Sequence, residues 1–119
     1  LYAMAPRQDI EQKWATNWDM LAPLMLPDGR YLRVESVSSR HIHVRVRFRQ
    51  GGERLSGRGM THDLKKLLQA SAIPPWERNR LPLLFCGDAL VAVAGTSLRS
   101  PEWPNGIQLM LEPAVSGAT

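Results

Sequence analysis

The chain has 119 residues, of which 44% are hydrophobic and 22% charged, and this composition is typical of one globular domain with a buried core. The sequence has no apolar run of the roughly eighteen residues that a membrane helix needs, so we expect no membrane span. The lone Cys86 leaves no internal disulfide, which favours a cytoplasmic location. The formal net charge of +4 and a pI near 9.8 fit a polyanionic partner.

The positive charge is concentrated in residues 40 to 80. This stretch holds ten Lys and Arg against three Asp and Glu, a local charge of +7, whereas the rest of the chain sums to -3. A charge distribution of this kind predicts one cationic face, which is the electrostatic signature of a surface that binds a polyanion.

The first expected elements are a helix and a hairpin. Ile10, Trp14 and Trp18 recur every four residues after Pro6, which predicts a helix over residues 6 to 19. We take residues 1 to 20 as a connecting helix from a preceding domain. The turn chemistry of residues 27 to 29, Pro-Asp-Gly, predicts a hairpin that continues as a strand from Tyr31.

Residues 41 to 49 alternate strictly between apolar and polar, which predicts a strand. Arg45, Arg47 and Arg49 share its outer face, at a spacing of about 6 to 7 Å that is close to that of backbone phosphates. We expect these arginines to contact phosphates and so to position a nucleic acid. The alternative is a solvated strand face whose charges only maintain solubility.

Residues 50 to 59 carry four glycines with Arg54 and Arg58, which predicts a mobile cationic loop. The glycines lack the Walker spacing, so the loop does not indicate ATP binding. It could offer backbone amides and two arginines to a ligand.

A helix is expected after this loop, with Thr61 as its N-cap and an end at Pro74. Lys65 and Lys66 fall on its solvent face, where they either extend the basic surface or are merely solvated. The buried stripe comprises Leu64, Leu67 and Leu68.

Trp76 follows Pro74 and Pro75 in a short predicted turn. We favour a core position for Trp76, because tryptophan is usually buried; the alternative is stacking on a base. Arg78 either holds this turn through Asp63 or Glu77 or contacts RNA.

The C-terminal part is expected to hold an apolar hairpin over residues 83 to 94, a last strand over residues 107 to 111 and a frayed tail from residue 113. His41 and His43 share a strand face, but the sequence places no third and fourth metal ligand at suitable spacing. We also find no catalytic dyad or triad.

Several segments together resemble one family. The segments Leu-Lys-Lys-Leu-Leu-Gln from residue 64, Ile-Pro-Pro-Trp-Glu-Arg from residue 73, and Leu-Pro-Leu-Leu from residue 81 are similar to the C-terminal domain of bacterial tRNA(Ile)-lysidine synthetase. The segment from Leu90 to Gly95, the arginine- and glycine-containing approach from Phe48 to Leu55, and the opening from Leu24 to Leu32 fit the same domain. The resemblance covers about residues 20 to 112.

The resemblance implies an α+β fold of small β-sandwich-like sheets with one principal helix, shared with part of the phenylalanine-tRNA synthetase beta chain. The full enzyme uses ATP and magnesium to adenylate the wobble cytidine of a CAU-anticodon tRNA(Ile), and then attaches lysine. Its Ser-Gly-Gly-x-Asp-Ser loop is absent from this sequence. The first residue is Leu1, and we expect a piece of a longer protein, inactive alone, from which the N-terminal catalytic domain is missing.

On this interpretation residues 21 to 112 form a domain that grips tRNA(Ile) near the acceptor stem. The alternative is a protein-interaction module that docks on the catalytic domains or forms a homodimer. We expect no catalytic, metal or cofactor site in this piece. The residues expected to bind tRNA are Arg45, Arg47, Arg49, Arg54, Arg58, Lys65, Lys66 and Arg78.

Overall fold

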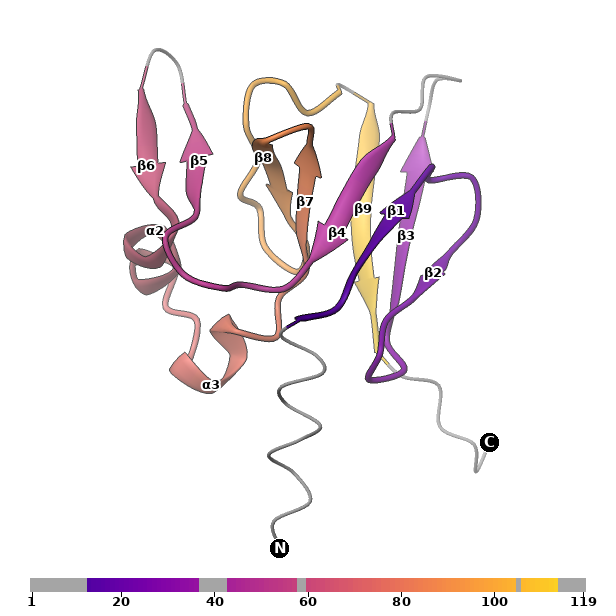
Figure 1. Cartoon of the computed structure of the whole chain (residues 1–119), viewed down its shortest axis with the longest axis horizontal. Helices are drawn as coiled ribbons and strands as arrows, with labels where there is room; N and C mark the ends of the chain where they lie inside the picture. Colours follow the sequence, from indigo (N-terminus) through magenta and orange to yellow (C-terminus); the bar gives the residue numbers. More distant parts are fainter. Residues whose placement is uncertain (1–12, 37–42, 58–59, 105, 114–119) are drawn as a thin grey trace, which may run out of the picture.

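The computed structural model describes residues 13–36, 43–57, 60–104 and 106–113, which form two β-sheets and two short helices (Figure 1). The larger sheet has the strand order β1 (Ala15–Trp18), β4 (Val44–Arg47), β7 (Leu83–Cys86), β8 (Ala89–Val93), β5 (Arg54–Ser56) and β6 (Thr61–Asp63). The smaller sheet has the order β2 (Leu24–Met25), β3 (Tyr31–Ser36) and β9 (Ile107–Glu112). The helices are α2 (Leu64–Ala70) and α3 (Pro75–Arg78). The expected α+β fold with one principal helix is therefore confirmed.

The two sheets pack face to face, and α2 covers the outer side of the larger one. The core between the sheets contains Val46, Leu84 and Ala92 from the larger sheet and Leu32 and Leu109 from the smaller. A second core joins α2 to the same strands and comprises Leu55, Leu64, Leu68, Leu81, Leu83, Phe85, Leu90 and Val93. Because both faces of β7 and β8 are covered, these strands are apolar at consecutive positions instead of alternating.

The helix expected up to residue 19 is wrong from Ala15 onward. Residues Ala15–Trp18 form β1, which pairs antiparallel with β4 in the register Trp18 to Val44. Trp14 and Trp18 are four residues apart, and a spacing of four places side chains on one face of a strand as well as of a helix. The sequence periodicity could not separate the two. The expected helix at residues 1–12 lies outside the described residues.

The loop expected over residues 50 to 59 is wrong at Arg54–Ser56, which form β5. This strand pairs antiparallel with β6, and Leu55 pairs in parallel with Leu90 of β8. Leu55 is buried in the α2 core, which supplies the driving force for strand formation in a segment rich in glycine. Residues 58 and 59 lie outside the described part of the chain.

The N-cap of helix α2 lies two residues after the expected N-cap. Thr61 pairs with Ser56 in the β5–β6 ladder, and the N-cap is Asp63, whose Oδ1 accepts from the Lys65 backbone N at 3.0 Å. At the other end, the N–H of Ala72 donates to the Gln69 carbonyl and that of Ile73 to the Leu68 carbonyl. Ala72 takes a left-handed conformation with a φ of 59°. This is the hydrogen-bond pattern of a Schellman cap, which usually has glycine at that position.

The two expected hairpins and the expected last strand, observed as β9, are confirmed. The turn over residues 27 to 29 joins β2 to β3, and β7 and β8 form the apolar hairpin. The helices of the described ranges are all too short and too polar to span a membrane. The expected frayed tail lies outside the described residues apart from Pro113.

Candidate nucleic-acid interface

Strand β4 presents its arginines on one face, as the alternation predicted. Val44 and Val46 are buried, whereas His43 and Arg45 are exposed. Arg47 differs from Arg45, because its guanidinium Nη1 lies 2.8 Å from Glu53 Oε2 and its Cζ lies 4.4 Å from the centre of the Phe85 ring. Arg45 makes no ion pair within the described chain. The three arginines of the predicted row are thus not equivalent: Arg45 has no ion pair within the described chain, Arg47 is bound to Glu53, and Arg49 bonds to Asn79.

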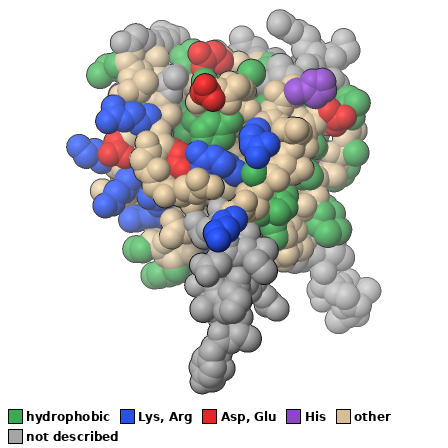
Figure 2. All heavy atoms as spheres, in the orientation of Figure 1, with side chains coloured by type: hydrophobic (Ala, Val, Ile, Leu, Met, Phe, Trp, Pro, Cys, Tyr) green, Lys and Arg blue, Asp and Glu red, His purple; other side chains and the backbone are tan. Residues whose placement is uncertain are grey.

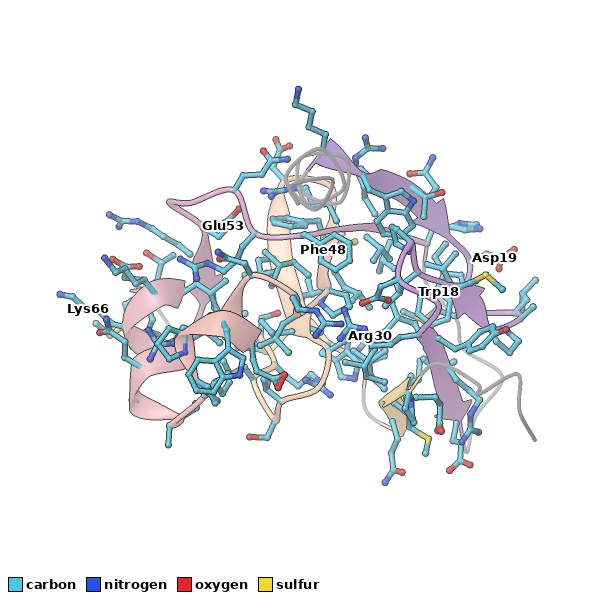
Figure 3. All side chains as sticks on the ribbon, turned by 90° about the horizontal axis from the view of Figure 1, so that it is seen from below. Trp18, Asp19, Arg30, Phe48, Glu53 and Lys66 are labelled. Atoms are coloured by element: carbon cyan, nitrogen blue, oxygen red, sulfur yellow. The ribbon has the colours of Figure 1, made fainter. Side chains whose placement is uncertain are left out.

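Glu53 organises the glycine-containing loop that follows β4. Its carboxylate accepts from the backbone amides of Gln50 at 2.8 Å and Gly51 at 3.0 Å, as well as from Arg47 (Figure 3). The side chain is buried, which by itself raises its pKa, but the Gln50 amide and Arg47 outweigh burial and the pKa of Glu53 is lowered. Two of the loop amides that the sequence offered to a ligand, those of Gln50 and Gly51, are therefore already bound by a carboxylate of the same chain.

The exposed cations of β5 and α2 lie at one end of the larger sheet. Arg54, Lys65 and Lys66 are all exposed, and Arg54 faces Asp63 across the β5–β6 ladder. Lys and Arg side chains gather over this end of the molecule, at the left of Figure 2. No ion pair involves Arg54, Lys65 or Lys66 within the described ranges. Arg58, the other arginine expected here, lies outside the described residues.

An open hollow of about 560 Å³ adjoins these cations. It lies between the glycine loop and strands β5 and β8, and its lining includes Arg47, Gly52, Arg54, Phe85 and Asp88. The lining also includes Glu53, so the hollow carries two arginines and two acidic residues, and it is open to solvent and does not enclose a small ligand.

The expectation that Trp76 plugs the core is wrong, since its side chain is 76% exposed. Arg78 takes the inward position on α3, where its Nε donates to the Ile73 carbonyl at 2.9 Å. Residues two apart lie on nearly opposite sides of a helix, so Trp76 points outward when Arg78 points inward.

Arg49 and Arg78 both attach to the turn that contains α3. Arg49 Nη1 lies 3.2 Å from Asn79 Oδ1, at the C-terminal end of α3. Arg78 bonds to a backbone carbonyl, whereas the sequence predicted pairing with Asp63 or Glu77. Arg49 thus reaches the C-terminal end of α3, the short helix that carries the exposed Trp76, and Arg78 fixes the turn.

An ionic cluster that the sequence analysis missed joins the β2–β3 turn to the segment after α3. Asp28 Oδ2 lies 2.6 Å from Arg30 Nε and 3.0 Å from Arg80 Nη2 (Figure 3). Burial raises the pKa of Asp28, but the Arg30 amide and the two guanidinium groups outweigh burial and the pKa is lowered. Arg80 is 52 residues from Asp28, so only knowledge of the tertiary structure could reveal the pair.

These features define the molecule as a small α+β domain in which the exposed cations Arg54, Lys65 and Lys66 lie at one end of the larger sheet and Arg45 lies on β4. The family described as TilS substrate C-terminal domain matches residues 44–103, and the chain belongs to this family. The resemblance found in the sequence is thereby confirmed.

The curated relatives agree with this assignment. The chain is 40% identical over 109 residues to a tRNA(Ile)-lysidine synthase of Xanthomonas campestris pv. campestris (strain 8004), a match that covers 87% of this chain and 25% of the relative. It is 45% identical over 104 residues to the enzyme of the same name from Xanthomonas axonopodis pv. citri, covering 84% of this chain and 23% of the relative. The chain thus spans about a quarter of the length of these relatives.

A solved structure described as the crystal structure of a TilS C-terminal domain has the same fold. It superposes with a TM-score of 0.55 at 23% identity, and the match covers 87% of this chain and all of the other. The two-sheet architecture is therefore that of a known fold.

Proposed function

We propose that the chain is the tRNA-gripping part of a tRNA(Ile)-lysidine synthase and acts in the cytoplasm. The carrying observation is that Arg45, Arg54, Lys65 and Lys66 are exposed and make no ion pair within the described ranges. Exposed cations without an ion-pair partner are available to bind an anion, and the names of the relatives point to tRNA as that anion.

These four side chains and Arg49 would contact phosphates, and we place the contact on the acceptor stem. The deep major groove of double-stranded RNA hides its base edges from side chains, so such a surface reads shape and charge. Arg47 and Arg78 would serve binding indirectly by fixing the loop and the α3 turn, since both bond within the fold.

The parent enzyme would carry out its catalytic chemistry in another part of the protein. That part corresponds to the region of the relatives that this chain does not span. That enzyme would use ATP and magnesium to activate the wobble cytidine and then attach lysine. In the described ranges the amides of Gln50 and Gly51 are bound by Glu53, and no three His, Cys, Asp or Glu come together. We therefore derive no catalytic step for this domain.

A salt titration tests the proposal. If about four phosphates are neutralised, the logarithm of the affinity for tRNA should fall against the logarithm of salt concentration with a slope of roughly -3 to -4. Replacing Lys66 with Gln should reduce this slope by about 1. Arg33→Gln is the matched control, because Arg33 lies on β3 in the other sheet and is paired with Glu112. A salt-independent affinity would refute the proposal.

A second candidate function is a docking module for the catalytic part of the enzyme or for a second copy of the chain. Leu21 and Met25 favour it, since they are 70% and 58% exposed beside the smaller sheet. Mixing the chain with tRNA and, separately, with the catalytic part distinguishes the two. Binding to the protein without binding to RNA would support the docking module.

A further inference from the structure

Trp76 is held outward on a rigid turn. Among the large hydrophobic side chains exposed in the described ranges, Trp76 is the one aromatic residue. Three hydrogen bonds fix the turn. The Glu77 N–H donates to the Pro74 carbonyl at 2.9 Å, and the Arg80 N–H donates to the Glu77 carbonyl at 3.0 Å. The Arg78 side chain donates to the Ile73 carbonyl. An indole fixed in solvent loses the free energy that its burial would contribute, and we looked for a partner that would cover it.

Two arginines lie at the C-terminal end of the helix that carries Trp76. Arg49 reaches the end of α3 through Asn79, and Arg80 follows the helix directly. Glu77 is the acidic residue within α3, and the nearby Asp28 carboxylate is already bound by Arg30 and Arg80. An aromatic face on a helix that ends at two arginines complements a ligand that combines a flat ring with negative charge.

We propose that Trp76 stacks on an unpaired base of the bound RNA while Arg49 contacts an adjacent phosphate. This inference rests on the proposed function, since it specifies which part of an RNA the α3 surface recognises. Bases inside a duplex are already stacked on their neighbours, whereas an unpaired base has a free face for an aromatic side chain. The cations of β4, β5 and α2 would contact the duplex itself.

The test uses this 119-residue chain and two RNAs: a blunt-ended duplex, and the same duplex with a short unpaired extension at its 3′ ends. The wild-type chain should bind the extended duplex more tightly. Trp76→Ala should weaken binding of the extended duplex by about tenfold and leave binding of the blunt duplex within about twofold. Trp76→Phe should retain most of the affinity, because it keeps an aromatic face.

Leu21→Ala is the matched control, because Leu21 is 70% exposed and lies outside α3. It should bind both RNAs like the wild type. Circular dichroism of each variant establishes that the fold is retained.

Three outcomes would overturn the inference. If the extension adds no affinity and Trp76→Ala changes nothing while both duplexes bind, the stacking role is wrong and the proposed function stands. If Trp76→Ala instead weakens only binding to the catalytic part of the enzyme, Trp76 is a protein contact. If the wild type binds neither RNA, the inference and the proposed function both fail.

Discussion

Oε2 of Glu53 lies 2.8 Å from Arg47 Nη1 and also accepts the backbone N–H of Gln50, while Oε1 accepts the backbone N–H of Gly51. An arginine and two loop amides are the groups that commonly bind a phosphate. Here they bind an internal carboxylate, so the loop has its shape before any RNA arrives.

Replacing Glu53 with Gln should lower the free energy of unfolding at pH 7 by about 2 kcal/mol, because a buried charged acceptor loses its strongest bonds. The pKa of Glu53 is lowered in the fold, so its contribution is complete above the ordinary carboxyl pKa and is lost as the pH falls through the lowered value. Urea denaturation should show the difference between variant and wild type shrinking below about pH 4. Glu77→Gln, an exposed control, should show little difference at any pH.

We expect Arg45 to act in tRNA binding and Arg47 to stabilise the fold. Arg45→Gln should weaken tRNA binding and leave the melting temperature within about 1 °C, since a surface substitution of this kind costs little stability. Arg47→Gln should lower the melting temperature by about 5 °C or more, because Glu53 then remains buried without its partner. Equal melting temperatures for the two variants would contradict the structural role of Arg47.

Asp28→Asn should weaken the junction between the β2–β3 turn and the segment after α3. Asp28 bridges two guanidinium groups and is largely buried, so we expect a loss of about 1 kcal/mol of unfolding free energy. The lowered pKa of Asp28 means that this loss, like that of Glu53, should diminish in acid. Glu35→Gln removes an exposed pair with Arg33 and should change the stability by less than Asp28→Asn does.

Ala72→Gly should stabilise the domain by about 0.5 kcal/mol. Ala72 has a φ of 59° at the end of α2, where a side chain is strained and glycine is not. The greater flexibility of glycine in the unfolded chain offsets part of this gain. Ala70→Gly, two residues earlier and within the helix, should instead destabilise by up to about 1 kcal/mol. Thermal denaturation of both variants measures the contrast.

Much of the fold could be predicted from local patterns. The alternation around Val44 and Val46 predicted β4, and the apolar run before Cys86 predicted β7, because each pattern has one backbone solution that buries its hydrophobic side chains. The spacing of Trp14 and Trp18 suits both helix and strand, and only pairing with β4 decides for the strand. Strand β5 was missed because Leu55, whose burial favours the strand in this glycine-rich segment, packs against residues far along the sequence such as Leu90.

The candidate site was harder to predict, because residues of the same type have different partners in the folded chain. Arg45 and Arg47 look alike in the sequence, and only the fold brings Glu53 and Phe85 against one of them. Burial statistics favoured a core position for Trp76, but the inward position on a single turn is taken by Arg78.

Leu55 with Leu90 is the one register pair that joins β5 to β8, whereas β4 and β7 share three. Strands β5 and β6 with α2 are therefore attached to the rest of the larger sheet mainly through side-chain packing. A unit joined by few backbone hydrogen bonds opens as a group at lower free energy than the whole domain. The amides of this unit should exchange with solvent before those of β4 and β7, so the end of the molecule that carries Arg54, Lys65 and Lys66 is also the end that can adjust its shape.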